Sequence, residues 1–209
     1  MHQMPLKVLS ALLLVSASIS AHSQISPAAQ GGGPLPLRVG AGYSNYGTDW
    51  GSRLGGPAVW IDFDLPKVSP AWSGFQIEVE GRDLNYTRSG GNPPDPKLRQ
   101  YTFAGGVNYA WRYDAAFHPY AKFLVGLGNI SFSHMSVPDA PLSYTHDSRA
   151  FYAPAGGVDV RVHHRIWIRG NYEYQFWRDF INHHTLTPHG FTVGVFYDFS
   201  RFALAEYNP

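Results

Sequence analysis

The chain has 209 residues, no cysteine and a formal net charge of +1, and only 15% of its residues are charged while another 15% are aromatic. The near-neutral charge argues against a nucleic-acid-binding surface or a polybasic anchor, and the absence of cysteine excludes disulfides, thiolate zinc sites and lipoprotein acylation. A typical soluble domain has about 25% charged residues. This chain therefore has little charge with which to cover a water-facing exterior.

The N-terminus has the layout of a secretory signal peptide. Lys7 precedes an apolar run at 8–17, and small residues then lead to Ser23, after which we expect cleavage. The apolar run is shorter than the roughly 20 residues that a helix needs to cross a bilayer. We therefore exclude 1–23 from the fold and expect a flexible, glycine-rich lead-in at 24–35.

The rest of the chain consists of segments in which apolar and polar residues alternate. Alternation at every second position places successive side chains on opposite faces of a β-strand. Tyr101 and Phe103, for example, alternate with Gln100 and Thr102. Eight strands of this kind are predicted, at 37–44, 59–65, 75–82, 100–113, 121–128, 158–163, 166–176 and 191–199.

The connections between these strands alternate in length. We expect four long loops, rich in Gly, Pro, Asn and Asp, at 45–56, 84–97, 131–148 and 177–188. The intervening connections are shorter, at 66–73, 114–119 and 164–165. Short turns on the side of the termini and long loops on the other side are typical of bacterial outer-membrane barrels. The predicted fold is all-β, an eight-stranded antiparallel up-and-down transmembrane β-barrel over 36–199 with four long extracellular loops.

The last predicted strand has an apolar or aromatic residue at every second position. These residues are Phe191, Val193, Val195, Tyr197 and Phe199. Together with the signal peptide and the eight alternating segments, this strand resembles the OmpA-like family of small outer-membrane β-barrel domains. The resemblance implies a location in the bacterial outer membrane, and it implies that the five residues form the signal read by the barrel-assembly machinery. A tail at 200–209 continues beyond the terminal Phe that the family pattern expects.

The lumen of an eight-stranded barrel is just wide enough for side chains to fill. The inward faces of the predicted strands carry charges of both signs, and charges removed from water must be paired. We therefore expect a cross-lumen ion-pair network with a structural role that leaves at most a very small pore. Its candidate members are Arg38, Asp62, Glu78, Glu80, Lys122, Asp159, Arg161, Arg169 and Glu173.

Histidines in and beside the predicted loops are the other chemically suggestive residues. Neutral imidazole is a common metal ligand, but the spacing of His134, His146, His183 and His184 matches no metal-binding motif. The prediction is therefore a protein without a metal site or cofactor. We expect a monomer in contact with outer-membrane lipid, with no nucleic-acid partner and an unidentified partner for the extracellular loops.

Two other functions stay open. An outer-membrane enzyme that modifies lipid would need a serine activated by a histidine, and the adjacent Ser133 and His134 would face opposite sides of a strand. A soluble lipocalin-like barrel would instead place Tyr101 and Phe103 in a ligand cavity. The low charge and the aromatic end of the last strand favour a non-catalytic, porin-like outer-membrane barrel with a structural role in the cell envelope or a loop-mediated role at its surface.

Overall fold

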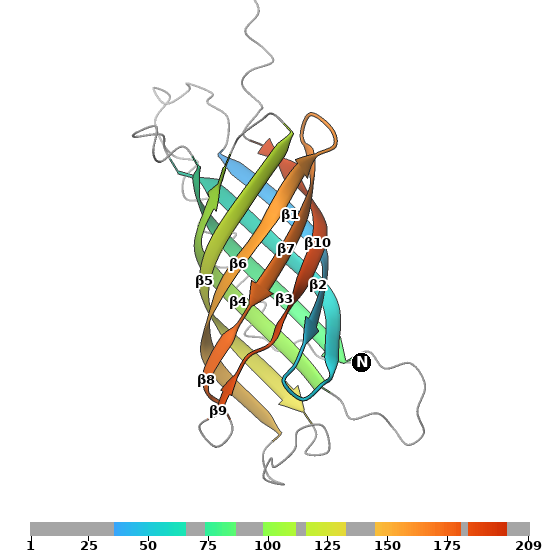
Figure 1. The fold of residues 1–209 in the computed structure, drawn as a ribbon, viewed down its shortest axis with the longest axis vertical. Coiled ribbons are helices and arrows are strands. Elements are labelled where there is room, and N and C mark those ends of the chain that lie inside the picture. The colour runs from blue at the N-terminus through green and yellow to red at the C-terminus, as the bar shows by residue number, and fades with distance from the viewer. Residues whose placement is uncertain are drawn as a thin grey trace, which may run out of the picture. The chain divides into compact units, whose positions relative to one another are not determined.

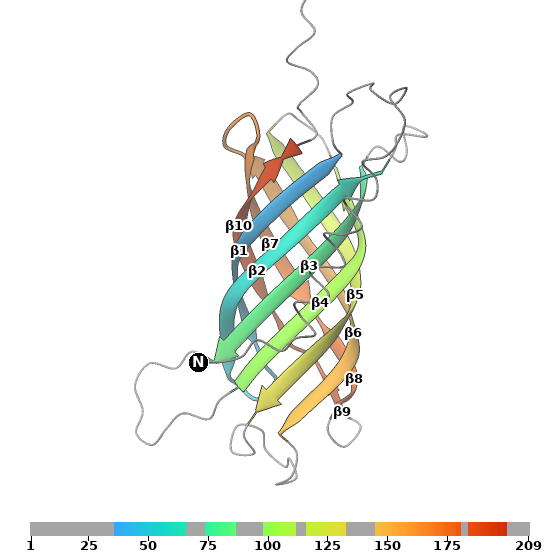
Figure 2. The same cartoon turned by 180° about the vertical axis from the view of Figure 1, so that it is seen from behind.

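The computed structural model describes residues 36–65, 74–86, 98–111, 116–132, 145–180 and 184–199. They form a closed, antiparallel β-barrel with tilted strands (Figures 1 and 2). The strands are β1 (Leu37–Gly47), β2 (Arg53–Asp64), β3 (Phe75–Tyr86), β4 (Leu98–Ala110), β5 (Phe117–Phe132), β6 (His146–Arg161), β7 (Ile166–Tyr174), β8 (Phe176–Phe180), β9 (His184–Leu186) and β10 (His189–Asp198). The predicted signal peptide, lead-in and tail lie outside the described residues.

The described strands form the predicted eight-stranded barrel, because two of the barrel strands are each interrupted once. Only Gln175 separates β7 from β8, and β6 pairs with both in one continuous register. A two-residue gap at 187–188 separates β9 from β10 in the same way. Pairing of β1 with β10 and of β5 with β6 closes the barrel. The described part of the chain has no helix that is long and apolar enough to span a membrane.

Several strands extend further than predicted at the end opposite the termini. β6 begins at His146 instead of 158, and the connection between β1 and β2 is only 48–52 instead of 45–56. At this end apolar side chains such as Phe151 fill the lumen. Apolar residues therefore occupy both faces of the strands, and the alternation that marks a strand in the sequence is lost.

Pro154 lies in the middle of β6, opposite Phe123 of β5. Proline has no backbone N–H to donate to a neighbouring strand. The break between β7 and β8 lies at the same level, at Gln175. The N–H of Gln175 donates instead to the carbonyl of Pro188, at 2.9 Å. The barrel thus stays closed around a locally interrupted ladder.

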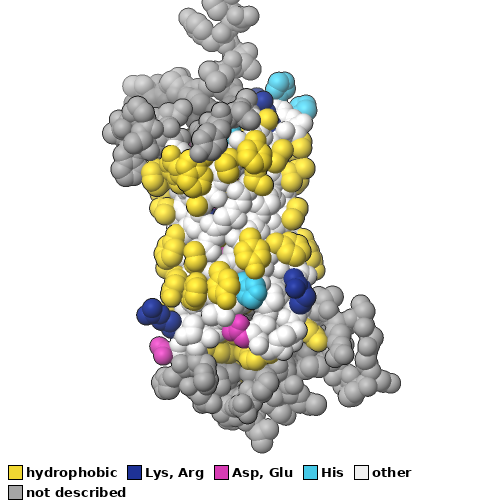
Figure 3. Space-filling model, in the orientation of Figure 1, with side chains coloured by type: hydrophobic (Ala, Val, Ile, Leu, Met, Phe, Trp, Pro, Cys, Tyr) yellow, Lys and Arg dark blue, Asp and Glu magenta, His cyan; other side chains and the backbone are white. Residues whose placement is uncertain are grey.

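The outside of the barrel is apolar. Side chains such as Phe103, Leu127 and Val195 are exposed by 66%, 70% and 54%, and hydrophobic side chains form bands around the face seen in Figure 3. Lys and Arg are seen toward both ends of that face, and Asp and Glu near its lower end (Figure 3). Tyr101 and Phe103 point outward, which is the reverse of a soluble barrel with an apolar cavity.

Candidate functional site in the barrel lumen

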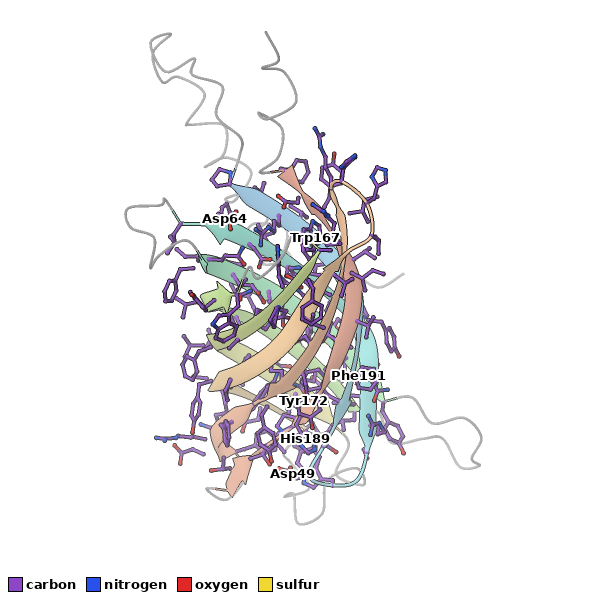
Figure 4. The ribbon with its side chains drawn as sticks, turned by 45° about the horizontal axis from the view of Figure 1, so that its top comes forward. Asp49, Asp64, Trp167, Tyr172, His189 and Phe191 are labelled. Carbon is purple, nitrogen blue, oxygen red and sulfur yellow. The ribbon has the colours of Figure 1, made fainter. Side chains whose placement is uncertain are left out.

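Most of the charged residues predicted to face the lumen are buried inside the barrel. Eight of the nine are at most 5% exposed, namely Arg38, Asp62, Glu78, Glu80, Lys122, Asp159, Arg169 and Glu173. The ninth, Arg161, is half-buried at the end of β6, and its guanidinium lies 5.9 Å from the ring of Trp167. Figure 4 shows Trp167 and Asp64 toward the end where β1 begins, and Asp49 and His189 toward the opposite end.

Arg169 of β7 is the centre of the ionic network. Its Nε and Nη2 donate to the two carboxylate oxygens of Asp159, at 2.8 and 3.0 Å. Nη2 also donates to Asp62 at 2.9 Å, and Nη1 donates to Glu78 at 3.2 Å. Because β3 and β7 lie opposite each other in the ring of strands, the bond to Glu78 crosses the lumen.

A second link across the lumen joins Arg82 of β3 to Glu173 of β7. Nη1 and Nη2 of Arg82 donate to the two oxygens of Glu173, at 2.6 and 2.8 Å. Arg82 also forms an ion pair with Glu80, and Lys122 bridges Glu80, at 2.8 Å, and Glu78. Our prediction missed Arg82. It lies two and four residues beyond Glu80 and Glu78 on the same strand, so its spacing was the available indication of an inward position.

Toward the outer end of the barrel, opposite the termini, the ionic network is followed first by amide side chains and then by an apolar cluster. Gln175 donates to Glu173 at 2.8 Å, and the amide of Gln100 and the indole of Trp177 both donate to Gln175, at 3.1 and 2.9 Å. The buried apolar cluster beyond these amides comprises Tyr46, Leu54, Leu84, Leu98, Ala104, Leu124, Ile130, Phe132, Phe151, Ala153, Trp177, Phe180 and Leu186. We call this cluster the outer cap.

A smaller aromatic cluster lies on the other side of Arg169, toward the barrel end near the termini. Trp60, Trp167 and Phe196 are buried together, and the rings of Trp167 and Phe196 stack with centroids 5.9 Å apart. The Arg169 guanidinium lies 5.3 Å from the ring of Trp60 and 5.1 Å from that of Phe196. We call this cluster the inner cap. The ionic network is thus enclosed between two apolar layers.

Arg38 is separate from the central network and lies at the barrel end near the termini. It forms ion pairs with Asp64 at 3.3 Å and with Asp198 at 3.6 Å, and Gln76 donates to Asp64 at 2.6 Å. Arg38 and Asp198 are also paired residues of β1 and β10. This group therefore ties together the first and last strands where the barrel closes.

Two inward glycines make room for the tryptophans of the caps. A Cβ on Gly40 would lie 2.3 Å from the Trp60 ring, and a Cβ on Gly128 would lie 2.0 Å from the Trp177 ring. Real Cβ atoms do not approach other atoms this closely. Each tryptophan thus fills the space that a side chain at the glycine would take.

The histidines that the structure describes do not form a shared metal site. The rings of His163 and His164 lie 5.5 Å apart in the turn after β6, while His189 stacks on Tyr174 at 4.9 Å. His134, His183 and the adjacent Ser133 lie outside the described residues. Among the residues that the structure describes, no three His, Asp or Glu side chains are arranged as a metal site.

A family model described as "Outer membrane protein beta-barrel domain" matches residues 9–199. The chain belongs to this family. It is therefore a protein of the bacterial outer membrane, and the predicted OmpA-like relationship and location are confirmed.

Solved structures of small outer-membrane barrels are similar to this one. Neisserial surface protein A has a TM-score of 0.58 and 13% identity, over 78% of this chain and 96% of that one. Ail, the attachment invasion locus protein of Yersinia pestis, has a TM-score of 0.52 and 14% identity, over 77% and 96%. The complex of Ail with the heparin analogue sucrose octasulfate gives 0.51 and 13%, over 77% and 96%. At these identities the likeness concerns the fold. A search of curated proteins found no match.

The residues of the predicted assembly signal lie on β10 and just after it. Phe191, Val193 and Val195 point outward and are exposed, while Tyr197 is half-buried. Phe199 follows the end of the strand, and its ring lies 4.7 Å from that of Tyr197. The three exposed residues lie on the lipid-facing side of β10, which pairs with β1 on one side and β7 on the other.

Proposed function

We propose that this member of the family is a non-catalytic outer-membrane barrel with a closed lumen, which serves the envelope as a structural element and as a scaffold for contacts at the cell surface. The observation that carries the proposal is the pair of ionic links between β3 and β7, enclosed by the outer and inner caps. In this proposal the predicted lumen residues are structural, and they neither conduct solutes nor catalyse a reaction.

A solute passing through the barrel would have to separate buried ion pairs. Arg169 would have to leave Glu78, and Arg82 would have to leave Glu173. Uncoupling one partner of a buried pair costs about 3–5 kcal/mol. Both caps would also have to open, with loss of their apolar packing. Passage of even small sugars should therefore be negligible.

A liposome-swelling assay with arabinose tests the closed lumen. The full chain, purified from outer membranes, should give no swelling above that of protein-free liposomes, while a general porin in parallel liposomes should give rapid swelling. A swelling rate comparable to that of the porin would contradict the proposal. Heat-modifiable migration in electrophoresis checks that the reconstituted barrel is folded.

The surface role rests on the outer end of the barrel, where β5, β6 and the β8–β9 hairpin extend beyond the predicted strand ends. Replacing 87–97 and 133–144 with short turns should leave the barrel folded and abolish binding of the protein to its surface partner. Sucrose octasulfate, which Ail binds, is one defined probe for this comparison. Equal probe binding by the full chain and the loop-replaced variant would contradict a role for these loops.

The absence of catalysis and the mode of assembly can be tested in cells. Overexpression should leave the mass spectrum of lipid A unchanged, whereas a new lipid A species that disappears in a Ser133→Ala variant would establish an enzyme. We also propose that the last strand is read by the barrel-assembly machinery and that the product is a monomer. Phe199→Ala should lower the amount of folded barrel, and an unchanged amount would count against this signal.

A further inference from the structure

The outward side chains just beyond the apolar band at the outer end form a polar ring around the barrel. Its members are Asn45, Arg53, Asp83, Arg99, Asn129, Ser148, Arg178 and His189. Most of them bond to a neighbour in the ring. Arg53 donates to Asn45 at 2.7 Å, Arg99 donates to Asp83 at 2.9 and 2.6 Å, and Asn129 donates to Ser148 at 2.7 Å.

Arg178 differs from the other two arginines of this ring. Within the described part of the chain, no hydrogen bond or ion pair joins its guanidinium to another side chain. The guanidinium instead lies over the ring of Tyr152, at 5.6 Å from the centroid. It is therefore held against the outer wall with its N–H donors available to a ligand.

The wall of the barrel is interrupted next to Arg178. The ladder between β6 and β8 ends at the pair Phe151–Trp177, although β6 continues to His146 along β5. Asp179 has a φ of 54°, an uncommon conformation for a residue other than glycine, and the pairing of β8 with β9 shifts register between Trp177 and Phe180. β8 thus bends away from β6 and leaves a groove.

The groove has a volume of about 490 Å³ and two chemically distinct parts. Its outward-facing apolar lining comes from Val125, Ala150, Tyr152 and Phe176. Phe151 of the outer cap also lines it, and its charged part comes from Arg149, Arg178 and Asp179. The Arg149 guanidinium also donates to Asp147, at 3.0 Å. The apolar part opens on the lipid-facing wall, and Arg178 lies in the polar ring. A molecule that fits both parts has an apolar chain below an anionic group.

We propose that this groove binds a phosphorylated, acylated glycolipid of the outer leaflet, with an acyl chain on Val125 and Phe176 and a phosphate at Arg178. Arginine pairs with phosphate through two parallel N–H···O bonds. Charge complementarity selects an anionic lipid over a neutral one, and the position on the membrane-facing wall selects a lipid over a free ion. The site goes beyond the proposed structural role and does not depend on it.

Native mass spectrometry of the full chain in neutral detergent tests the site. The probes are bisphosphorylated lipid A, the same lipid without its phosphates, and inorganic phosphate. We expect one bisphosphorylated lipid per barrel, at least tenfold weaker binding of the dephosphorylated lipid, and no displacement by millimolar phosphate. A tenfold change corresponds to about 1.4 kcal/mol. Equal binding of the two lipids, or displacement by phosphate, would overturn the proposal.

Matched variants locate the site. Arg178→Gln should weaken binding of the bisphosphorylated lipid at least tenfold, while Arg53→Gln, in the same ring but on β2 opposite β6, should change it less than twofold. Ala150→Phe, which fills the apolar part and keeps every charge, should weaken binding of both lipids. Equal losses in the two arginine variants would indicate a diffuse charge effect and refute the groove. Heat-modifiable migration verifies that each variant is folded.

Discussion

Replacing Arg82 with methionine tests whether the buried network stabilises the barrel through specific pairing. The Arg82–Glu173 pair is almost fully buried, with side-chain exposures of 1% and 0%. In Arg82→Met, Glu80 keeps Lys122, but Glu173 keeps only the neutral amide of Gln175 among the bonds described above. Loss of one partner of a buried pair costs about 3–5 kcal/mol. We expect the free energy of unfolding to fall by about 4 kcal/mol, on the same basis.

The exposed pair of Arg99 and Asp83 is the matched control. It is also bidentate, through Nε and Nη2 of Arg99, and joins the neighbouring strands β3 and β4, but its side chains are 46% and 32% exposed. Such a pair contributes about 0–1 kcal/mol, so Arg99→Met should have little effect. The double variant Arg82→Met/Glu173→Met should regain most of the lost stability, because replacing both charges by apolar groups is often neutral.

Urea-induced unfolding of the barrel in lipid vesicles, followed by heat-modifiable migration, measures these differences. The fraction of folded protein is read at each urea concentration, and the free energy of unfolding follows by linear extrapolation. Equal losses for Arg82→Met and Arg99→Met would refute the reasoning. So would a double variant that is less stable than Arg82→Met, because the cost would then not arise from an uncompensated carboxylate.

Three further substitutions probe the wall and the caps by the same urea titration. Val195→Arg places a charge on the outward face and should lower the free energy of unfolding by about 2–4 kcal/mol at the membrane midplane. The control Val195→Leu should have no such effect, and an unchanged stability of Val195→Arg would mean that this face does not contact lipid. Gly128→Ala should cost about 1–3 kcal/mol through overpacking against Trp177. Gly170→Ala should be near neutral, because a Cβ there meets no atom within 4 Å; equal effects of the two alanines would show that the outer cap adapts easily.

The alternation of apolar residues predicted the membrane-facing wall because lipid imposes one requirement on every outward position. The inward position of Glu78 and Arg169 follows from the same phase, since both lie on the polar face of an alternating strand. Which carboxylate each cation meets could not be predicted. Arg169 reaches Glu78 on the opposite strand because the stagger of all intervening strands brings them to the same depth.

The outer end of the barrel was predicted less well for two physical reasons. Phe151 and Tyr152 are both aromatic although they face opposite sides, because the outer cap is apolar and the wall is apolar too. The groove depends on the local backbone at Asp179, whose positive φ has no sequence signature as clear as a glycine. Strand ends and the groove therefore required the three-dimensional pairing of β6 with β8.

The outer cap gives the extracellular tip of this protein a source of stability that does not depend on the bilayer. Its leucines and aromatic rings are buried by the strands themselves, as in the core of a water-soluble β-protein. By the general behaviour of loops on a packed scaffold, we expect substitutions in the residues that connect those strands to leave the cap, the lipid-facing wall and the ionic network intact.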